Sequence, residues 1–296
     1  MRHIYIRGII GLIWLVAAIV CGVSGNFPMM GLYLVLAGVF LYSAYAAWKK
    51  EKDGKGGGGG KMGETLLTIK NLSAWYSEEK RMLSGFSFSL AEHEVAGLIG
   101  LNGAGKTTFL KVLSGLLPTF RSDGICFSGA PVDFRKQDFK LCRYTVFAED
   151  NSFSYFTFRE YLAYVCAAYD QEVPDVSELI QGFHFEGYTD TLLRELSTGN
   201  RKKAFLITAF ALKPRLLLLD EPVNGLDFLS TEYLYEQISG YKEHGTVLFS
   251  SHILESITLT SDRVFVLEDG RIRQTFERGQ INAEDIREAL HDENDR

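Results

Sequence analysis

A short segment rich in glycine has the residue types and the spacing of a phosphate-binding loop. Gly100–Thr107 reads GLNGAGKT and fits the pattern G-x-x-x-x-G-K-[ST]. The apolar run Val95–Ile99 predicts a buried strand, and apolar residues at helical spacing after Lys106 predict a helix that Pro118 ends. A strand, a glycine loop and a helix in this order favour a phosphate site over a glycine turn that merely caps a helix.

Each residue type in this loop suits one part of a nucleotide. Glycine lets main-chain N–H groups turn toward a phosphate, and the helix N-terminus adds a partial positive charge. Lys106 is expected to reach the β- and γ-phosphates, and Thr107 is expected to offer its hydroxyl to Mg²⁺. The expected nucleotide contacts of the loop are Asn102, Gly103, Ala104, Gly105, Lys106, Thr107 and Thr108.

Two carboxylates follow a run of four leucines, which is the second strong signal. Leu216–Leu219 predicts a strand that is buried on both faces, as in a parallel sheet. Such sheets bind ligands at the carboxyl ends of their strands, where Asp220 and Glu221 stand. Asp220 suits Mg²⁺, directly or through water, and Glu221 suits the polarisation of an attacking water molecule. The alternative is a strand that ends in solvated acids.

A histidine and a tyrosine are further candidates. His252 ends the apolar run Thr246–Ser251, and we interpret it as a γ-phosphate contact rather than as an exposed surface histidine. Tyr76 lies between two alternating stretches that predict half-buried strands, Leu66–Leu72 and Phe86–Leu90. The residues alone favour strand packing for Tyr76 over stacking on a nucleotide base.

The first fifty residues are far more apolar than the rest of the chain. Two runs, Ile6–Val23 and Met29–Trp48, are each close to the ~20 residues with which a helix spans a bilayer. Basic residues flank the pair and none lies in the turn between them, so both ends are expected in the cytoplasm. We therefore predict a transmembrane hairpin over residues 1–48. The alternatives are a signal peptide and a buried hairpin of a soluble domain.

The remaining chain divides into a linker, a large domain and a tail. Residues 49–63 contain five consecutive glycines and predict a flexible linker. From residue 64 short strands and helices alternate, with mainly helical patterns over about 150–213, as expected of an α/β nucleotide-binding domain. Residues 281–296 predict a C-terminal helix and a charged tail. The formal net charge of −6 gives no indication of a nucleic-acid partner.

Residues 64–280 resemble the ATP-binding subunit of ABC transporters, most closely those that work with multidrug- or peptide-export permeases. Leu216–Glu221 resembles the family's Walker B strand and follows the phosphate loop in the family's order. Leu196–Asn200, LSTGN, resembles the signature motif that is usually LSGGQ, and Asn224–Asp227 resembles the D-loop. His252 resembles the switch histidine. The resemblance implies an α/β P-loop NTPase of the ABC type, with a mixed β core and a helical subdomain, here preceded by the two-helix hairpin.

The resemblance also implies a mechanism. In this family two ATP-binding domains face head to tail and enclose two ATP molecules. Ser197 and Gly199 of one domain are then expected to contact the γ-phosphate that Lys106 of the other domain holds. Glu221 and His252 are expected to act on the attacking water. ATP closes this dimer, hydrolysis opens it, and a membrane permease follows that cycle.

Three further residues receive expected roles from the resemblance. Tyr76 stands where the family stacks an aromatic ring on adenine, which reverses the preference for strand packing. Asp227 of the D-loop joins the expected nucleotide site. Glu149, with Ala148 as the alternative, stands where the Q-loop glutamine of the family contacts Mg²⁺ and water. The expected metal ligands are therefore Thr107, Asp220 and Glu149.

The sequence departs from the family pattern at several positions besides Glu149. The signature has Thr198 where the family has glycine and Asn200 where it has glutamine. His93 replaces a glycine, and Phe228 stands where a proline commonly follows the D-loop aspartate. A β-branched residue in the signature could crowd the approach of the main chain to phosphate. These changes bear on turnover and coupling more than on ATP binding.

The leading hypothesis is an ATPase subunit that powers a membrane exporter with ATP and Mg²⁺ as cofactors. Its expected partners are a separate permease subunit, a second ATP-binding domain in a homodimer or heterodimer, and the lipid bilayer. We expect the chain at the cell membrane, with the ATP-binding domain on the cytoplasmic side. One alternative is an ATP-gated regulatory or sensor subunit with little turnover. Another is a soluble ABC protein that acts on ribosomes, a class that usually carries two ATP domains in one chain.

Overall fold

The computed structural model divides the chain into two compact units, Met1–Lys61 and Met62–Arg296. Both sheets lie in the second unit. The described residues are Met29, Tyr33, 64–77 and 80–291.

The predicted hairpin over residues 1–48 lies outside the described residues, except for Met29 and Tyr33, and so does the whole of the predicted linker over residues 49–63. Within the described part of the chain, no helix combines the length and the apolar character that crossing a membrane requires.

The second unit contains strands, α-helices and short 3-10 helices. The strands are β1 (Thr65–Ser77), β2 (Lys80–Ala91), β3 (Val95–Ile99), β4 (Phe120–Arg121), β5 (Gly124–Phe127), β6 (Ala130–Pro131), β7 (Arg143–Val146), β8 (Leu216–Asp220), β9 (Thr246–Ser251), β10 (Arg263–Glu268) and β11 (Arg271–Glu277). The helices are α3 (Lys106–Leu113), α4 (Gln137–Cys142), α5 (Phe158–Ala168), α6 (Ser177–Gly182), η1 (Glu186–Tyr188), η2 (Leu193–Glu195), α7 (Thr198–Leu212), α8 (Phe228–Gly240), η3 (Tyr241–Glu243), α9 (Leu254–Thr260) and α10 (Ala283–His291).

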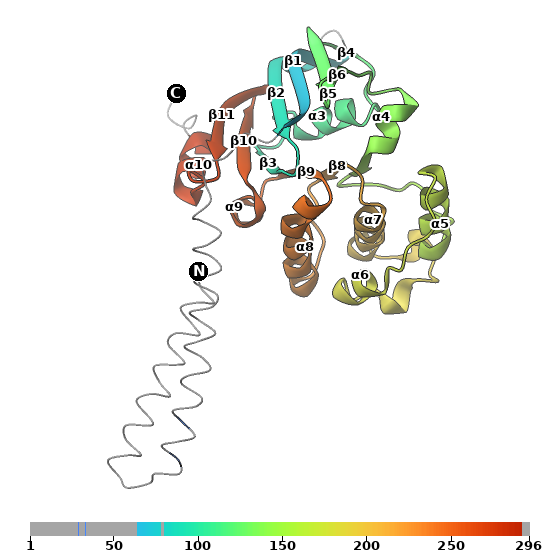
Figure 1. Cartoon of the computed structure of the whole chain (residues 1–296). Coiled ribbons are helices and arrows are strands. Elements are labelled where there is room, and N and C mark those ends of the chain that lie inside the picture. The colour runs from blue at the N-terminus through green and yellow to red at the C-terminus, as the bar shows by residue number, and fades with distance from the viewer. Residues whose placement is uncertain (1–28, 30–32, 34–63, 78–79, 292–296) are drawn as a thin grey trace. The chain divides into compact units, whose positions relative to one another are not determined.

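The strands form two sheets. The larger sheet has the order β11-β10-β3-β9-β8-β7, with parallel pairing from β10 to β7 and an antiparallel hairpin of β10 and β11 at one edge. The smaller sheet is antiparallel, with the order β2-β1-β5-β6 and β4 paired to β1. Figure 1 shows α3 between the smaller sheet and the parallel strands, while α7, α8 and α9 lie on the other side of β3, β8 and β9.

The four-leucine strand β8 joins two hydrophobic cores. Leu216 and Leu218 pack with α3 and the smaller sheet, whereas Leu217 and Leu219 pack with the helices on the opposite face. All four side chains are fully buried. The prediction of a parallel strand with two covered faces is therefore confirmed, since alternate side chains point to opposite faces.

The helical part begins with a well-formed N-cap. Thr157 and Glu160 form a capping box at the start of α5, with each side chain bonded to the main chain of the other. Ser197 caps α7 by accepting a hydrogen bond from the main-chain N–H of Asn200 at 3.2 Å. Helix α7 therefore begins directly after Ser197.

The helix after the phosphate loop is shorter than predicted. It ends at Leu113 rather than near Pro118, because Gly115 adopts a left-handed conformation with φ of 70°. The N–H of Gly115 donates to Val112 and the N–H of Leu116 donates to Lys111, so the last carbonyls are satisfied. The glycine, not the proline, is the stop signal.

Candidate active site

The phosphate loop connects β3 to α3 as predicted. Gly103 and Gly105 have φ of 89° and 108°, a region that disfavours side chains, and a Cβ on Gly105 would lie 2.9 Å from Leu83. The Lys106 ammonium donates to the main-chain oxygen of Gly100 at 2.6 Å and to that of Leu101 at 3.4 Å. The lysine side chain therefore folds back over the loop that a phosphate would enter.

Thr107 and Asp220 form a pair of hard oxygen donors beside this loop. The Thr107 hydroxyl donates to Asp220 Oδ2 at 2.9 Å, and the Ser250 hydroxyl donates to Asp220 Oδ1 at 2.6 Å. Asp220 is only 1% exposed. Across the described residues no group of three or more His, Cys, Asp or Glu side chains is placed to hold a metal. The pair fits Mg²⁺, which binds proteins through one or two carboxylates and takes its other ligands from phosphates and water.

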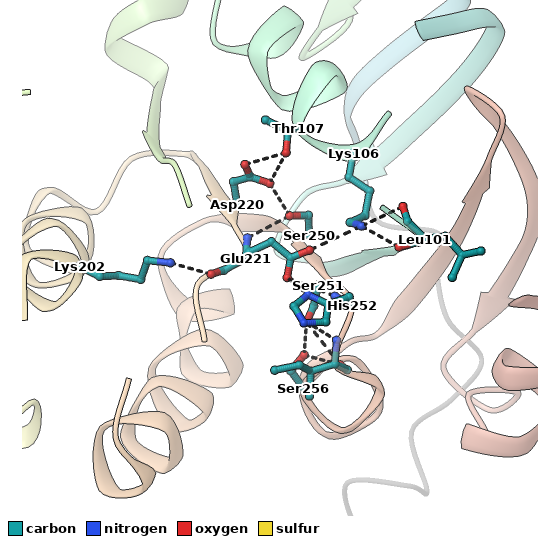
Figure 2. A network of polar contacts seen from close by, with 12 residues as sticks. Leu101, Lys106, Thr107, Lys202, Asp220, Glu221, Ser250, Ser251, His252 and Ser256 are labelled. Carbon is teal, nitrogen blue, oxygen red and sulfur yellow. Dashed lines mark hydrogen bonds and ion pairs between the residues drawn. The ribbon is translucent and has the colours of Figure 1, made fainter. Parts of the chain in front are cut away.

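Glu221 stands at the tip of β8 in an unusual main-chain conformation. Its φ of 47° lies in the left-handed region, and its N–H donates to the Ser250 carbonyl and hydroxyl oxygens at 3.2 and 3.0 Å. The carboxylate lies 3.5 Å from the Lys106 ammonium. His252 donates its main-chain N–H to Glu221 Oε2, and its Nδ1 lies 2.8 Å from the same oxygen. Figure 2 shows these side chains converging from three segments of the chain.

Two residues that the sequence reasoning missed complete this network. Ser250 bridges Asp220 and Glu221, and the parallel register of β8 and β9 sets it opposite Asp220. Lys202 of α7 is buried, and its ammonium donates to the main-chain oxygen of Glu221 at 2.8 Å. Burial lowers the pKa of Lys202, while the carboxylates of Asp220, Glu221 and Glu149 act to raise it.

The signature and D-loop residues have contacts of their own, away from Lys106. A Cβ on Gly199 would lie 2.2 Å from the carbonyl oxygen of Gly225, so these two segments touch within one chain. Asp227 forms an ion pair with Lys203 at 2.6 Å and caps α8 by accepting from the N–H of Ser230. Although burial acts to raise it, these hydrogen bonds lower the pKa of Asp227 below its ordinary value.

Tyr76 lies on β1 and is 46% exposed, with the Lys111 ammonium 5.8 Å from the centroid of its ring. The Tyr76 ring is therefore only partly covered by its neighbours on β1 and α3.

Glu149 faces two cavities. One, of about 690 Å³, is lined by Thr107 and Asp220 as well as Glu149. The other, of about 150 Å³, is lined by Glu149 and Lys202. Glu149 thus stands between the expected metal site and the buried lysine of α7.

The chain is similar in sequence and in fold to the ATP-binding proteins of ABC transporters. Residues 83–224 match the family model for ABC transporters. The chain is 33% identical to a protein of Bacillus subtilis (strain 168) named as an ABC transporter ATP-binding protein, AlbC, over 73% of this chain and 93% of AlbC. It is 30% identical to the SkfA peptide export ATP-binding protein SkfE of the same organism, over 71% and 88% of the two chains. A solved ATP-binding subunit of an ABC transporter has a TM-score of 0.66 and 28% identity, over 72% of this chain and 90% of that chain.

Proposed function

The chain belongs to the ABC transporter family, whose ATP-binding domains are ATPases, and we propose that it powers export across a membrane by ATP-driven closure of a dimer. The observation that carries this proposal is the meeting of Lys106, Glu221 and His252 beside the Thr107–Asp220 pair. These groups are an ammonium that can bind phosphate, a carboxylate, an imidazole and a pair of oxygens that can bind a metal. The hydrolysis of ATP uses groups of these kinds.

Each group has a role in the proposed reaction. Lys106 leaves the loop carbonyls to bind the γ-phosphate. Thr107 and Asp220 would hold Mg²⁺, which would neutralise charge on the phosphates. Glu221 accepts a hydrogen bond from the attacking water and takes its proton. The His252 side chain is half exposed and hydrogen-bonded to Glu221, so it can meet the γ-phosphate and orient the carboxylate at once.

The proposed dimer completes the site from a second ATP-binding domain. Ser197 and Gly199 lie at the N-terminal end of α7, where main-chain N–H groups and the helix dipole favour an anion. We propose that this end of α7 meets the γ-phosphate held by the partner domain, with Asp227 of the D-loop beside it and Tyr76 on the adenine.

ABC ATP-binding subunits work with membrane permeases, and we propose a separate export permease as the partner here. SkfE, a relative, is named for peptide export. The two apolar runs within residues 1–48 support a membrane tether that keeps the ATP-binding domain on the cytoplasmic side.

A regulatory subunit with little turnover is the second candidate. Thr198 in the signature and Glu149 in the Q-loop position favour it, because both change groups that the family uses at the γ-phosphate and the metal. The turnover number separates the two candidates, since a regulatory subunit would bind ATP without appreciable steady-state hydrolysis.

Light scattering on the full-length chain in detergent tests the closure step. The Glu221→Gln variant is expected to double its protein mass when ATP and Mg²⁺ are added, because it binds ATP and cannot hydrolyse it. The Lys106→Ala variant is the matched control and should keep its mass. A Glu221→Gln chain whose mass does not change with ATP contradicts dimer closure.

A further inference from the structure

A lysine near the signature segment reaches the catalytic strand. Lys202 lies close to the start of α7, is 3% exposed, and donates from its ammonium to the main-chain oxygen of Glu221 at 2.8 Å. Helix α7 belongs to the helical part of the domain, whereas Glu221 ends a strand of the larger sheet. Figure 2 shows the Lys202 side chain extended toward Glu221 from the side opposite Lys106. The hydrogen bond therefore joins two parts of the domain at the main-chain carbonyl of Glu221, the residue that we propose acts on water.

The main chain of Glu221 needs such support. Its left-handed φ of 47° is costly for a residue with a side chain and persists only where neighbours hold it. Ser250 accepts from the N–H of Glu221, while the Lys202 ammonium at 2.8 Å and the N–H of Asn224 at 3.2 Å donate to its carbonyl, so both main-chain polar groups of this residue are fixed. A charged donor makes the stronger kind of hydrogen bond.

Lys202 also faces the position where the chain departs from its family. Glu149 and Lys202 line one cavity of about 150 Å³, together with Thr198 and Arg201. A positive charge at Lys202 therefore stands across from the negative charge that Glu149 adds near Asp220. The charges of Lys202 and Glu149 attract one another across the cavity, although the two side chains do not form a direct ion pair.

We infer that Lys202 is a positioning residue that holds Glu221 in its left-handed conformation and offsets the charge of Glu149. Through this hydrogen bond, a shift of α7 and of the signature residues at its start changes the orientation of the Glu221 carboxylate. The inference rests on the proposed function, because it requires Glu221 to act on the attacking water.

Steady-state kinetics of the full-length chain test this inference. Lys202→Met should lower kcat by about 10-fold to 100-fold, the range expected when a hydrogen bond from a charged donor is lost. The KM for ATP and the binding of a non-hydrolysable ATP analogue should stay within about twofold, because Lys202 touches no expected nucleotide contact. Lys202→Arg should recover part of the lost rate, since it restores a charged donor.

Arg201→Met is the matched control. It removes the same charge from the same helix and cavity, yet Arg201 makes no hydrogen bond to Glu221. Its kcat should remain within about twofold of the wild-type value. Thermal melting of both variants separates a local effect from unfolding. This inference expects Lys202→Met to lose turnover even if its melting temperature equals that of the wild type.

A double variant tests the link to Glu149. The fold-loss caused by Lys202→Met should be at least about threefold smaller in a Glu149→Gln background than in the wild type, because no uncompensated carboxylate remains. Losses that multiply independently overturn the charge balance, and an unchanged kcat in Lys202→Met overturns the positioning role. Either result leaves the proposed function intact if Glu221→Gln has lost turnover, whereas a wild-type chain without turnover overturns both.

Discussion

The Lys106 ammonium and the Glu221 carboxylate lie 3.5 Å apart, and both side chains are largely buried. The same ammonium donates to the Gly100 carbonyl at 2.6 Å, so the lysine is held by the loop on one side and by the carboxylate on the other. A phosphate that enters the loop competes with Glu221 for Lys106. Once Lys106 turns to the phosphate, Glu221 becomes free to accept a hydrogen bond from water.

Lys106→Ala should weaken ATP binding by about 10-fold or more, because a charge-assisted contact to phosphate is lost. It should also lower the free energy of unfolding, since the buried Glu221 carboxylate then loses its ion pair with Lys106 and, among the described residues, keeps only its contacts with His252. Isothermal titration with ATP and thermal melting measure the two effects. Lys140→Ala, on the exposed surface of α4, is the control and should change neither. Unchanged affinity in Lys106→Ala contradicts the phosphate role.

Gly199→Ala should disturb the contact between the signature and D-loop segments. A Cβ at this position would lie 2.2 Å from the Gly225 carbonyl oxygen, which is main chain and cannot turn aside. Overpacking of this kind costs about 1–3 kcal/mol, so the melting temperature and the ATPase rate should both fall. Gly187→Ala is the control, because no atom lies within 4 Å of its added Cβ. Equal melting curves for the two variants refute the close approach.

Glu149→Gln should make ATP affinity depend less steeply on Mg²⁺. Glu149 shares a cavity with Thr107 and Asp220, so its charge acts on a bound nucleotide when no cation offsets it. Like charges about 4 Å apart cost ~1 kcal/mol in water and ~4 kcal/mol at an effective dielectric of 20. ATP titrations of wild type and variant across Mg²⁺ concentrations measure the difference. Superimposable curves would place Glu149 outside the metal site.

Membrane attachment should depend on the N-terminal apolar runs. The full-length chain, expressed without a permease, is expected to stay with the membrane pellet after carbonate and salt extraction. A chain that lacks residues 1–61 should bind ATP and remain in the supernatant. Full-length protein that both treatments release would show that the hairpin prediction is wrong.

Local pattern was sufficient to predict the strands and loops that carry the chemistry. Val95–Thr107 and Leu216–Glu221 each combine a buried apolar strand with polar groups at its tip, and in the sheet β9 pairs with both strands. Ser250 and Lys202 could not be found in this way. Ser250 gains its role from the register of β9 against β8, and Lys202 gains its role from the packing of a helix on a distant strand. Neither contact leaves a repeating pattern in the amino-acid sequence from which it could be predicted.

The fold accounts for one departure from the family and one error of prediction. His93, which stands where the family has glycine, has a φ of 58° and uses its ring Nδ1 at 2.6 Å from the Lys242 carbonyl oxygen. The position needs a left-handed conformation, and the side chain finds a local contact there. The predicted end of α3 near Pro118 is wrong because Gly115, in a left-handed conformation, ends the helix earlier, as glycine near a helix end commonly does. Phe228 is 75% exposed at the start of α8, and no contact among the described residues explains this exposure.

Steady-state hydrolysis of ATP by the full-length chain, with Mg²⁺ present, tests the central claim most directly. The Glu221→Gln variant should lose about 100-fold or more in kcat, the usual cost of removing one transition-state contributor. Its affinity for ATP should be equal to or higher than that of the wild type, because Lys106 no longer pairs with a charged carboxylate. A Glu221→Gln chain that hydrolyses ATP at nearly the wild-type rate would contradict the account.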